Sequence, residues 1–323
     1  MVKDLHRLYI TEPHPHKDAL YVLRGDGRRS FCAGGDVKAL VAAHQAQDNH
    51  TFYTTEYRVD AYIATMPQAQ VVMWAGHVLG SGVGVSLHGR HRVACETTRF
   101  AMPETHIGAV NDVGTGWVFS SIPVKGLGAY MVITGGALKG ADVYHAGLAN
   151  HYIPLEKYDA VEAALATLPG EAAAASCLDA FAANVAVPPF TLAGQEAVIA
   201  KAFGDAEEST RLQDIMEKLR ADDSAFALDT LKLMERISPF GMVLALENMK
   251  RQHTPACNSL LDCLRGDFAE VTSADVKREL AIGVKALLVA KEKYPKWTHK
   301  SVQDVDVAAT RNLFTLPPGM ASF

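Results

Sequence analysis

The seventeen residues Phe100-Ala-Met-Pro-Glu-Thr-His-Ile-Gly-Ala-Val-Asn-Asp-Val-Gly-Thr-Gly116 place two carboxylates, Glu104 and Asp112, among apolar and turn residues. An ionised carboxylate is costly to bury without partners, so such an acid is either satisfied by its neighbours or takes part in chemistry. Acids at turns also cap backbone amides, and this purely structural role remains an alternative. The flanking glycines favour a pocket lined by backbone and a few converging acids.

Two glycine-rich turns precede this segment. The first, Phe31-Cys-Ala-Gly-Gly-Asp36, leads into a predicted helix that has Asp36 as its N-cap. The second, Gly76-His-Val-Leu-Gly-Ser-Gly-Val-Gly84, follows a predicted strand. Amides at a helix start have no intrahelical acceptor and lie at the positive end of the helix dipole, so two such amides at one point would form an oxyanion hole. Glycines that only serve tight turns remain an alternative.

Composition excludes several classes of protein and ligand. The chain has 323 residues, 49% of them hydrophobic, which is enough for one large or two smaller domains. No run approaches the roughly 18 apolar residues of a membrane span, and the net charge of −5 argues against nucleic acid as the main ligand. The five cysteines form no C-x-x-C pair, which favours free thiols in a reducing compartment.

Neither a metal nor a redox cofactor is expected. His14 and His16 are the closest pair among the thirteen histidines, and no third ligand is evident near them. The glycines of the second turn have the wrong spacing for the dinucleotide fingerprint G-x-G-x-x-G. We therefore expect no metal and no nicotinamide cofactor.

The pattern along the chain changes near residue 168. Before it, predicted strands at 19–23, 70–74 and 92–95 alternate with predicted helices at 36–47 and 52–66, which indicates a largely parallel α/β core. After it, helical spacing dominates, and the helices are predicted at 171–187, 192–203, 210–218, 225–237, 242–251 and 274–293. We therefore divide the chain into an α/β core with the active site, residues 1–168, and a helical region, residues 169–323.

Several long motifs resemble the crotonase (enoyl-CoA hydratase/isomerase) superfamily. They are Phe31-Cys-Ala-Gly-Gly-Asp36, Gly80-Ser-Gly-Val-Gly-Val-Ser-Leu-His-Gly89, Arg92-Val-Ala94 and Phe100-Ala-Met-Pro-Glu104. Further motifs resemble the 3-hydroxyisobutyryl-CoA hydrolase subfamily, namely Met102-Pro-Glu-Thr105 with Asp112-Val-Gly114, Leu138-Lys-Gly-Ala-Asp-Val-Tyr-His-Ala-Gly147, Gly283-Val-Lys-Ala286 and Tyr294-Pro-Lys-Trp297. The resemblance covers nearly the whole chain and is strongest from residue 30 to 150.

The resemblance implies a fold and a set of site residues. The fold is a crotonase-like ββα spiral core with a mostly helical C-terminal region. The amides of Gly35 and Ser81 correspond to the oxyanion hole, and Glu104 corresponds to the carboxylate that attacks the thioester or activates water. Asp112 corresponds to the acid that orients the acyl hydroxyl or the water, and Glu56 to an acid near the substrate.

The resemblance also implies an activity. It is the hydrolysis of a short 3-hydroxyacyl-CoA thioester, such as 3-hydroxyisobutyryl-CoA in valine catabolism, to the free acid and CoA. No cofactor is needed beyond the CoA of the substrate. A mitochondrial location and a homo-oligomer are expected, although no targeting peptide is visible at the start of the sequence. Gly84 stands where a hydratase carries a glutamate, which disfavours hydration of an enoyl-CoA.

Five positions and the N-terminus depart from the family pattern. Ser81 replaces a glycine, which is tolerated only if its φ is negative or the strain is offset. Asn111 and Thr115 replace a proline and a glycine beside the second acid. Ile282 and Ala290 stand where the hydrolases usually carry acids. Met1 aligns inside the first helix of the family, so the N-terminal strands are expected to be missing.

Missing strands define an alternative function. An open sheet edge exposes unpaired backbone groups that a partner can cover. The alternative is therefore a non-catalytic crotonase-fold subunit of a large assembly, such as the mitochondrial small ribosomal subunit.

Overall fold

The computed structural model describes residues 1–46, 50–204 and 210–316. The chain forms two compact units, and each unit is assembled from three separate segments. The first unit consists of Met1–Gly35, Thr55–Ala101 and Ala137–Leu192. The second consists of Asp36–Thr54, Met102–Gly136 and the residues from Ala193 onwards.

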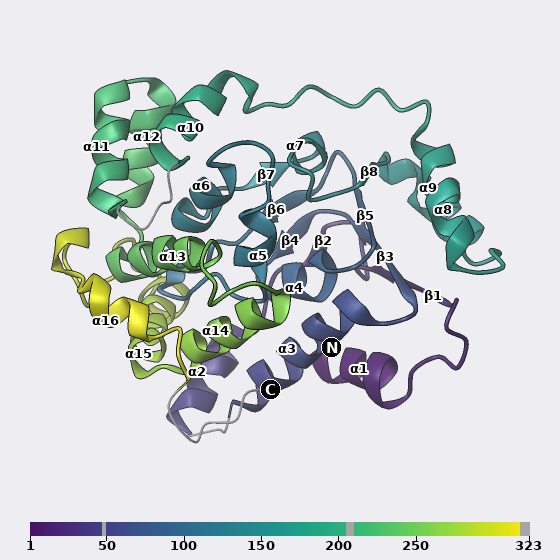
Figure 1. The fold of residues 1–323 in the computed structure, drawn as a ribbon, viewed down its shortest axis with the longest axis horizontal. Coiled ribbons are helices and arrows are strands. Elements are labelled where there is room, and N and C mark those ends of the chain that lie inside the picture. The colour runs from purple at the N-terminus through teal and green to yellow at the C-terminus, as the bar shows by residue number, and fades with distance from the viewer. Residues whose placement is uncertain (47–49, 205–209, 317–323) are drawn as a thin grey trace. The chain divides into compact units, whose positions relative to one another are not determined.

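The strands of the first unit form two four-stranded sheets. The strands are β1 (Leu20–Arg24), β2 (Ser30–Cys32), β3 (Ala69–Trp74), β4 (His77–Leu79), β5 (His91–Ala94), β6 (Arg99–Ala101), β7 (Leu138–Lys139) and β8 (His151–Tyr152). The first sheet has the order β1-β3-β5-β8, and its neighbouring strands are all parallel. The second has the order β2-β4-β6-β7 and is parallel except for the last pair. Figure 1 shows β1, β3 and β5 side by side in the first sheet.

Helices connect these strands and cover the first sheet, as parallel pairing requires. They are α1 (Val2–His6), η1 (Arg7–Thr11), α3 (Thr51–Thr65), α4 (Ser81–Leu87), α7 (Ala141–His145), η3 (Leu155–Lys157), α8 (Tyr158–Leu165), η4 (Glu171–Ala173) and α9 (Ala174–Ala182). Residues of α3 before Thr55 belong to the second unit.

Strand β3 is buried along its whole length and supplies the core of the first unit. On one face, Val71 and Met73 pack in a cluster with Val161 of α8 and Leu178 of α9. This alternation is the two-residue period of a strand that is covered on both sides.

The opposite face of β3 carries polar side chains whose nitrogen donors are hydrogen-bonded. The Trp74 indole nitrogen donates to the Ser86 hydroxyl at 3.0 Å, and this hydroxyl donates in turn to the Gly82 carbonyl at 2.6 Å. The Gln70 amide donates to the Tyr9 hydroxyl at 3.0 Å. Trp74 therefore ties α4, and with it the second glycine turn, to the central strand.

The second unit is helical in every element that the structure describes. These elements are α2 (Val37–Gln45), η2 (Glu104–Ile107), α5 (Thr115–Phe119), α6 (Leu127–Thr134), η5 (Ala193–Gln195), α10 (Glu196–Phe203), α11 (Leu212–Asp222), α12 (Ala225–Met234), α13 (Pro239–Arg251), α14 (Leu260–Thr272), α15 (Ala274–Gly283), η6 (Val284–Ala290), η7 (Val302–Asp304) and α16 (Val307–Asn312). Helix α13 is buried from Pro239 to Lys250. It is capped by Ser238, whose hydroxyl accepts from the Gly241 amide at 3.0 Å.

The predicted strands at 19–23, 70–74 and 92–95 are confirmed as β1, β3 and β5. Asp36 caps α2 as predicted and accepts from the Ala39 amide at 3.0 Å, while residue 47 of that predicted helix lies outside the described residues. The described elements after residue 168 are all helices. The division of the chain at this residue stays a prediction.

Helix α14 was not predicted, and neither was the second sheet. The strands β2, β4 and β6 have three residues each, and β2 and β4 adjoin the glycine turns, so these segments are too short to show strand alternation. Among the described residues, no helix is long and apolar enough to cross a membrane.

We predict that Ser86→Ala lowers the free energy of unfolding by about 1–3 kcal/mol, because the buried Trp74 indole N–H loses its acceptor. Urea unfolding followed by circular dichroism measures this change. Ser121→Ala, at an exposed serine, serves as the control and should change stability by less than about 0.5 kcal/mol. Equal effects of the two substitutions would show that the Trp74 contact contributes nothing.

Candidate active site

The second glycine turn places Ser81 at the first position of α4. Gly80 before it has φ +52°, a conformation that favours glycine, whereas Ser81 is not among the non-glycine residues with positive φ. A serine at this position therefore causes no backbone strain, because Ser81 does not have the positive φ that would require glycine. As the first helical residue, Ser81 has an amide with no intrahelical acceptor.

The two glycine turns touch each other within the first unit. They follow β2 and β4, which pair in parallel. A Cβ on Gly34 would lie 3.4 Å from the Leu79 carbonyl oxygen, and a Cβ on Gly82 would lie 2.6 Å from the Cβ of Cys32. This close approach requires glycine at position 82, and it brings Gly35 and Ser81 onto adjoining turns.

Glu56 lies on α3 with 1% of its surface exposed. Burial raises the pKa of the Cys32 thiol, a backbone hydrogen bond with Gly34 opposes this, and the negative charge of Glu56 raises the pKa further. Glu56 therefore acts electrostatically on the first glycine turn, while Cys32 is held as a thiol and is a poor nucleophile. Asp60, one helical turn after Glu56, is also fully buried and was not identified from the sequence.

In the second unit, Glu104 begins η2 and is half-buried. The side-chain amide of Asn111 donates to the Glu104 carboxylate at 3.2 Å and to the Met102 carbonyl at 2.7 Å. Asn111 stands where the family pattern has a proline. Its amide fixes the carboxylate to the turn that leads to Asp112.

The turn after Asp112 has an uncommon backbone. Val113 has φ +54° and Gly114 has φ +74°. A β-branched residue in the left-handed region is strained by about 1–3 kcal/mol and persists only where its surroundings hold it. Two hydrogen bonds close the turn, because the amide and hydroxyl of Thr115 both donate to the Asp112 carbonyl, at 3.1 and 2.8 Å.

A buried carboxylate on α14 holds the same turn from the other side. The Gly114 amide donates to Asp267 at 2.8 Å, and the Asn248 side-chain amide donates to the second carboxylate oxygen at 3.2 Å. Gln252 donates to the Asn248 side-chain oxygen at 2.6 Å and extends the network. Asp267 is fully buried, so these hydrogen bonds replace those that its carboxylate would make with water.

The environment favours the protonated forms of two acids on α14. Burial raises the pKa of Asp267 to about 6, an effect that the Arg251 charge opposes. Burial raises the pKa of Glu270 well above its usual range, and the negative charges of Asp267 and Asp112 add to this. Asp112 therefore lies within electrostatic reach of a cluster of buried acids.

Sequence reasoning missed Asp267 and Glu270. The available signal was the one that singled out Glu104, namely acids among the apolar residues Phe268, Ala269 and Val271. As for metal binding, no group of three or more His, Cys, Asp or Glu side chains in the described part of the chain could hold an ion.

The chain is similar to known proteins both in sequence and in structure. The family described as Enoyl-CoA hydratase/isomerase matches residues 1–314. The "3-hydroxyisobutyryl-CoA hydrolase, mitochondrial" of Xenopus laevis is 32% identical over 96% of this chain and 79% of its own length. The protein of that name from Dictyostelium discoideum is 33% identical over 97% of this chain and 84% of its own length.

Among solved structures, the carnitinyl-CoA dehydratase of Mycobacterium thermoresistibile aligns with a TM-score of 0.80 and 33% identity. The alignment covers 93% of this chain and 84% of the dehydratase chain. The predicted fold class is thereby confirmed. The proteins compared here are named as enzymes, and they lend no support to the ribosomal-subunit alternative.

We predict that Asp267→Asn changes the pH dependence of stability. Because the pKa of Asp267 is about 6 in the folded protein and its ordinary value is 3.8, the stabilising contribution is full below about pH 4 and is lost as the pH rises through about 6. Relative to the variant, the wild type should lose up to about 3 kcal/mol, since one pKa unit corresponds to about 1.4 kcal/mol.

Chemical unfolding at several pH values measures this difference. Asp229→Asn, at a carboxylate that is 74% exposed, is the matched control and should retain the wild-type profile. A stability difference between wild type and Asp267→Asn that stays constant from about pH 4 to pH 7 would contradict the raised pKa.

Proposed function

The chain belongs to the enoyl-CoA hydratase/isomerase family, and from this membership we propose that it hydrolyses a short 3-hydroxyacyl-CoA thioester, with 3-hydroxyisobutyryl-CoA as the first candidate. The observation that carries the proposal is the Asn111 side chain, which holds Glu104 by a hydrogen bond beside the strained turn of Asp112. Relatives named as hydrolases of this thioester cover almost the whole chain and support the choice.

The reaction adds one water across the bond between the acyl carbon and sulfur. The Glu104 carboxylate either takes a proton from the attacking water or attacks the acyl carbon itself to form an anhydride that water then opens. The carbon–sulfur bond breaks, CoA leaves as the thiolate, and the thiolate takes up a proton. Both routes consume one water and yield the free acid and CoA.

Negative charge develops on the thioester oxygen in both routes. We assign the stabilisation of this charge to the amides of Gly35 and Ser81, which lie on the two adjoining glycine turns. Loss of one such donor typically costs about 3–4 kcal/mol of transition-state stabilisation. The serine at position 81 is compatible with this role because only its backbone is used.

We also propose roles for Asp112 and Glu56. Asp112 is presented by a turn that its own backbone carbonyl closes, and we assign its side chain to orienting the acyl hydroxyl or the water. Glu56 is buried near the first glycine turn, where it acts on the substrate or on the turn itself. No cofactor enters this chemistry beyond the CoA of the substrate.

Hydration of an enoyl-CoA is the competing reaction within the family. Gly84 lies inside α4, is buried, and has no side chain that could hold a water. Thioester hydrolysis needs a carboxylate from only one position, and Glu104 supplies it. The relatives named above are mitochondrial by name, and we propose the same location for this protein.

We predict that the wild type releases CoA from 3-hydroxyisobutyryl-CoA and that Glu104→Gln lowers kcat at least about 100-fold, the usual effect of losing a general base. A thiol reagent that reports free CoA measures the rate. Asn111→Ala should also lower kcat, by a smaller factor, since Glu104 then loses one of the groups that position it.

The control for these variants is Glu217→Gln, at an exposed glutamate of α11. It should retain the wild-type kcat. If the folded wild type releases no CoA, or if Glu104→Gln matches the control, Glu104 does not have the proposed role.

A further inference from the structure

Two buried cysteines lie together at the start of α14. Cys257 is 2% exposed and Cys263 is fully buried, and a hydrogen bond joins their thiols. Both residues also contact the Ser259 carbonyl oxygen, the Cys257 sulfur at 4.0 Å and the Cys263 amide at 3.1 Å. A disulfide bond holds its sulfurs about 2.05 Å apart, so thiols that already contact each other need only a small further approach.

The cap of α14 explains this proximity. The Ser259 hydroxyl accepts from the Asp262 amide at 3.1 Å and donates to the Asp262 carboxylate at 2.6 Å. A capped helix start directs the preceding chain against the fourth helical residue, which here is Cys263. Cys257 lies two residues before the cap, so the backbone itself holds the two thiols near each other.

The charges around the pair give the two thiols different chemistry. Nη2 of Arg251 donates to the Cys263 carbonyl at 3.3 Å, which places a cation beside the pair. The hydrogen bond from Cys263 lowers the pKa of the Cys257 thiol, burial opposes this, and the Arg251 charge lowers the pKa further. The same hydrogen bond and burial raise the pKa of Cys263 well above its usual value. Cys257 is therefore the thiol that reacts first, and Cys263 is the partner that closes the bond.

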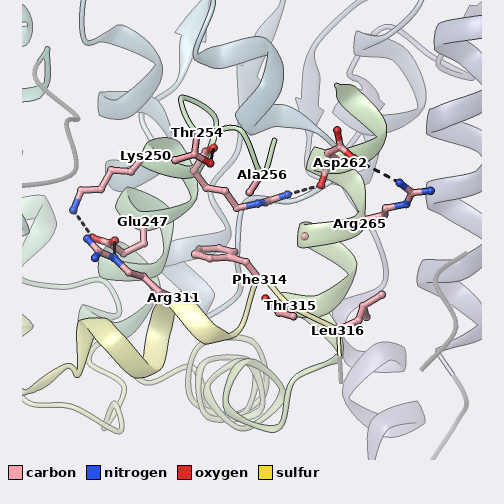
Figure 2. A pocket seen from close by; sticks show the side chains of 12 residues that line it. Glu247, Lys250, Thr254, Ala256, Asp262, Arg265, Arg311, Phe314, Thr315 and Leu316 are labelled. Atoms are coloured by element: carbon pink, nitrogen blue, oxygen red, sulfur yellow. Dashed lines mark hydrogen bonds and ion pairs between the residues drawn. The ribbon is translucent and has the colours of Figure 1, made fainter. Parts of the chain in front are cut away.

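A cavity of about 560 Å³ in the second unit brings small molecules close to the pair. Its lining includes Thr254 and Ala256 beside Cys257, and Asp262 beside Cys263. Figure 2 shows Ala256 and Asp262 in the wall of this cavity. A water molecule takes up about 30 Å³ in the liquid, so hydrogen peroxide, with one oxygen more, fits easily into the cavity.

We propose that Cys257 and Cys263 form a reversible disulfide bond when the protein meets a peroxide. The Cys257 sulfur attacks one peroxide oxygen, the oxygen–oxygen bond breaks, and the products are a sulfenic acid and one water. The Cys263 sulfur then attacks the Cys257 sulfur, the sulfur–oxygen bond breaks, and a second water leaves. Two electrons pass from the thiols to the peroxide, and each thiol proton ends in one of the two waters.

The disulfide removes two donors from the network that holds the Gly114 amide. In the reduced protein, Cys257 donates to the Gln252 side-chain oxygen at 2.9 Å, and Cys263 donates to Asp267 at 3.8 Å. Asp267 in turn accepts from the Gly114 amide at 2.8 Å. A buried acceptor that loses a donor destabilises its surroundings, so oxidation should loosen the strained turn at Gly114.

Peptide mass measurement on the full chain treated with hydrogen peroxide tests the disulfide. Trypsin releases both cysteines in one peptide, 252–265, which has no internal Lys or Arg. Free thiols are alkylated before digestion, so the linked peptide alone should escape the reagent, weigh two hydrogen atoms less than the unmodified peptide, and revert on reduction. Cys177→Ser, at a half-buried cysteine of the first unit, is the control and should retain this result.

Three results would overturn the proposal. They are a peptide 252–265 that stays fully alkylated, one that gains oxygen irreversibly, and a disulfide from either cysteine to another part of the chain.

Deuterium exchange tests the link to the turn. In peptic peptides that cover residues 111–116, oxidation should raise the exchange rate at least about twofold, and reduction should reverse this. Cys257→Ser keeps a hydroxyl donor for Gln252 but cannot form the disulfide, so peroxide should leave its exchange at the reduced level. Equal exchange in oxidised and reduced wild type would contradict the link. An effect on thioester hydrolysis rests on the proposed function, whereas mass and exchange need no substrate, so the two can fail separately.

Discussion

The hydrogen bond between the Gly114 amide and the Asp267 carboxylate is the interaction on which the candidate site depends. It joins a strained turn, with Val113 at φ +54°, to a buried helix of the second unit. Without a fixed acceptor, the turn could relax to an ordinary conformation and move Asp112. The same segment carries Asn111, so the position of Glu104 depends on it as well.

The cost of this arrangement is the burial of acids. Asp267 and Glu270 are both fully enclosed, and desolvation is the largest influence on the pKa of each. The positive charge of Arg251 offsets part of that cost.

Much of the fold and part of the site could be predicted from the sequence. The buried strands and the Asp36 cap follow from local patterns, and the glycine turns were identified from their sequence, whereas their close backbone approach is visible only in the structure. Helix α14 was not predicted, because Asp267 and Glu270 interrupt its apolar face and Gly266 lies in its interior. Polar residues that are buried because they bind other polar groups do not add to the hydrophobic periodicity from which a helix is predicted.

Two departures from the family pattern acquired a physical meaning in the structure. Ser81 uses only its backbone and has an ordinary helical conformation. Asn111 provides a donor to Glu104 that a proline side chain could not provide. Neither effect can be inferred from residue type alone, since both depend on where a neighbouring backbone or carboxylate lies.

The most direct measurement is the mass of the products formed from 3-hydroxyisobutyryl-CoA in water enriched with heavy oxygen. The account predicts free CoA in equal amount to an acid that carries solvent oxygen in its carboxyl group, because water ends on the acyl carbon by either route of Glu104. A product that gains or loses water while it remains attached to CoA would contradict thioester hydrolysis.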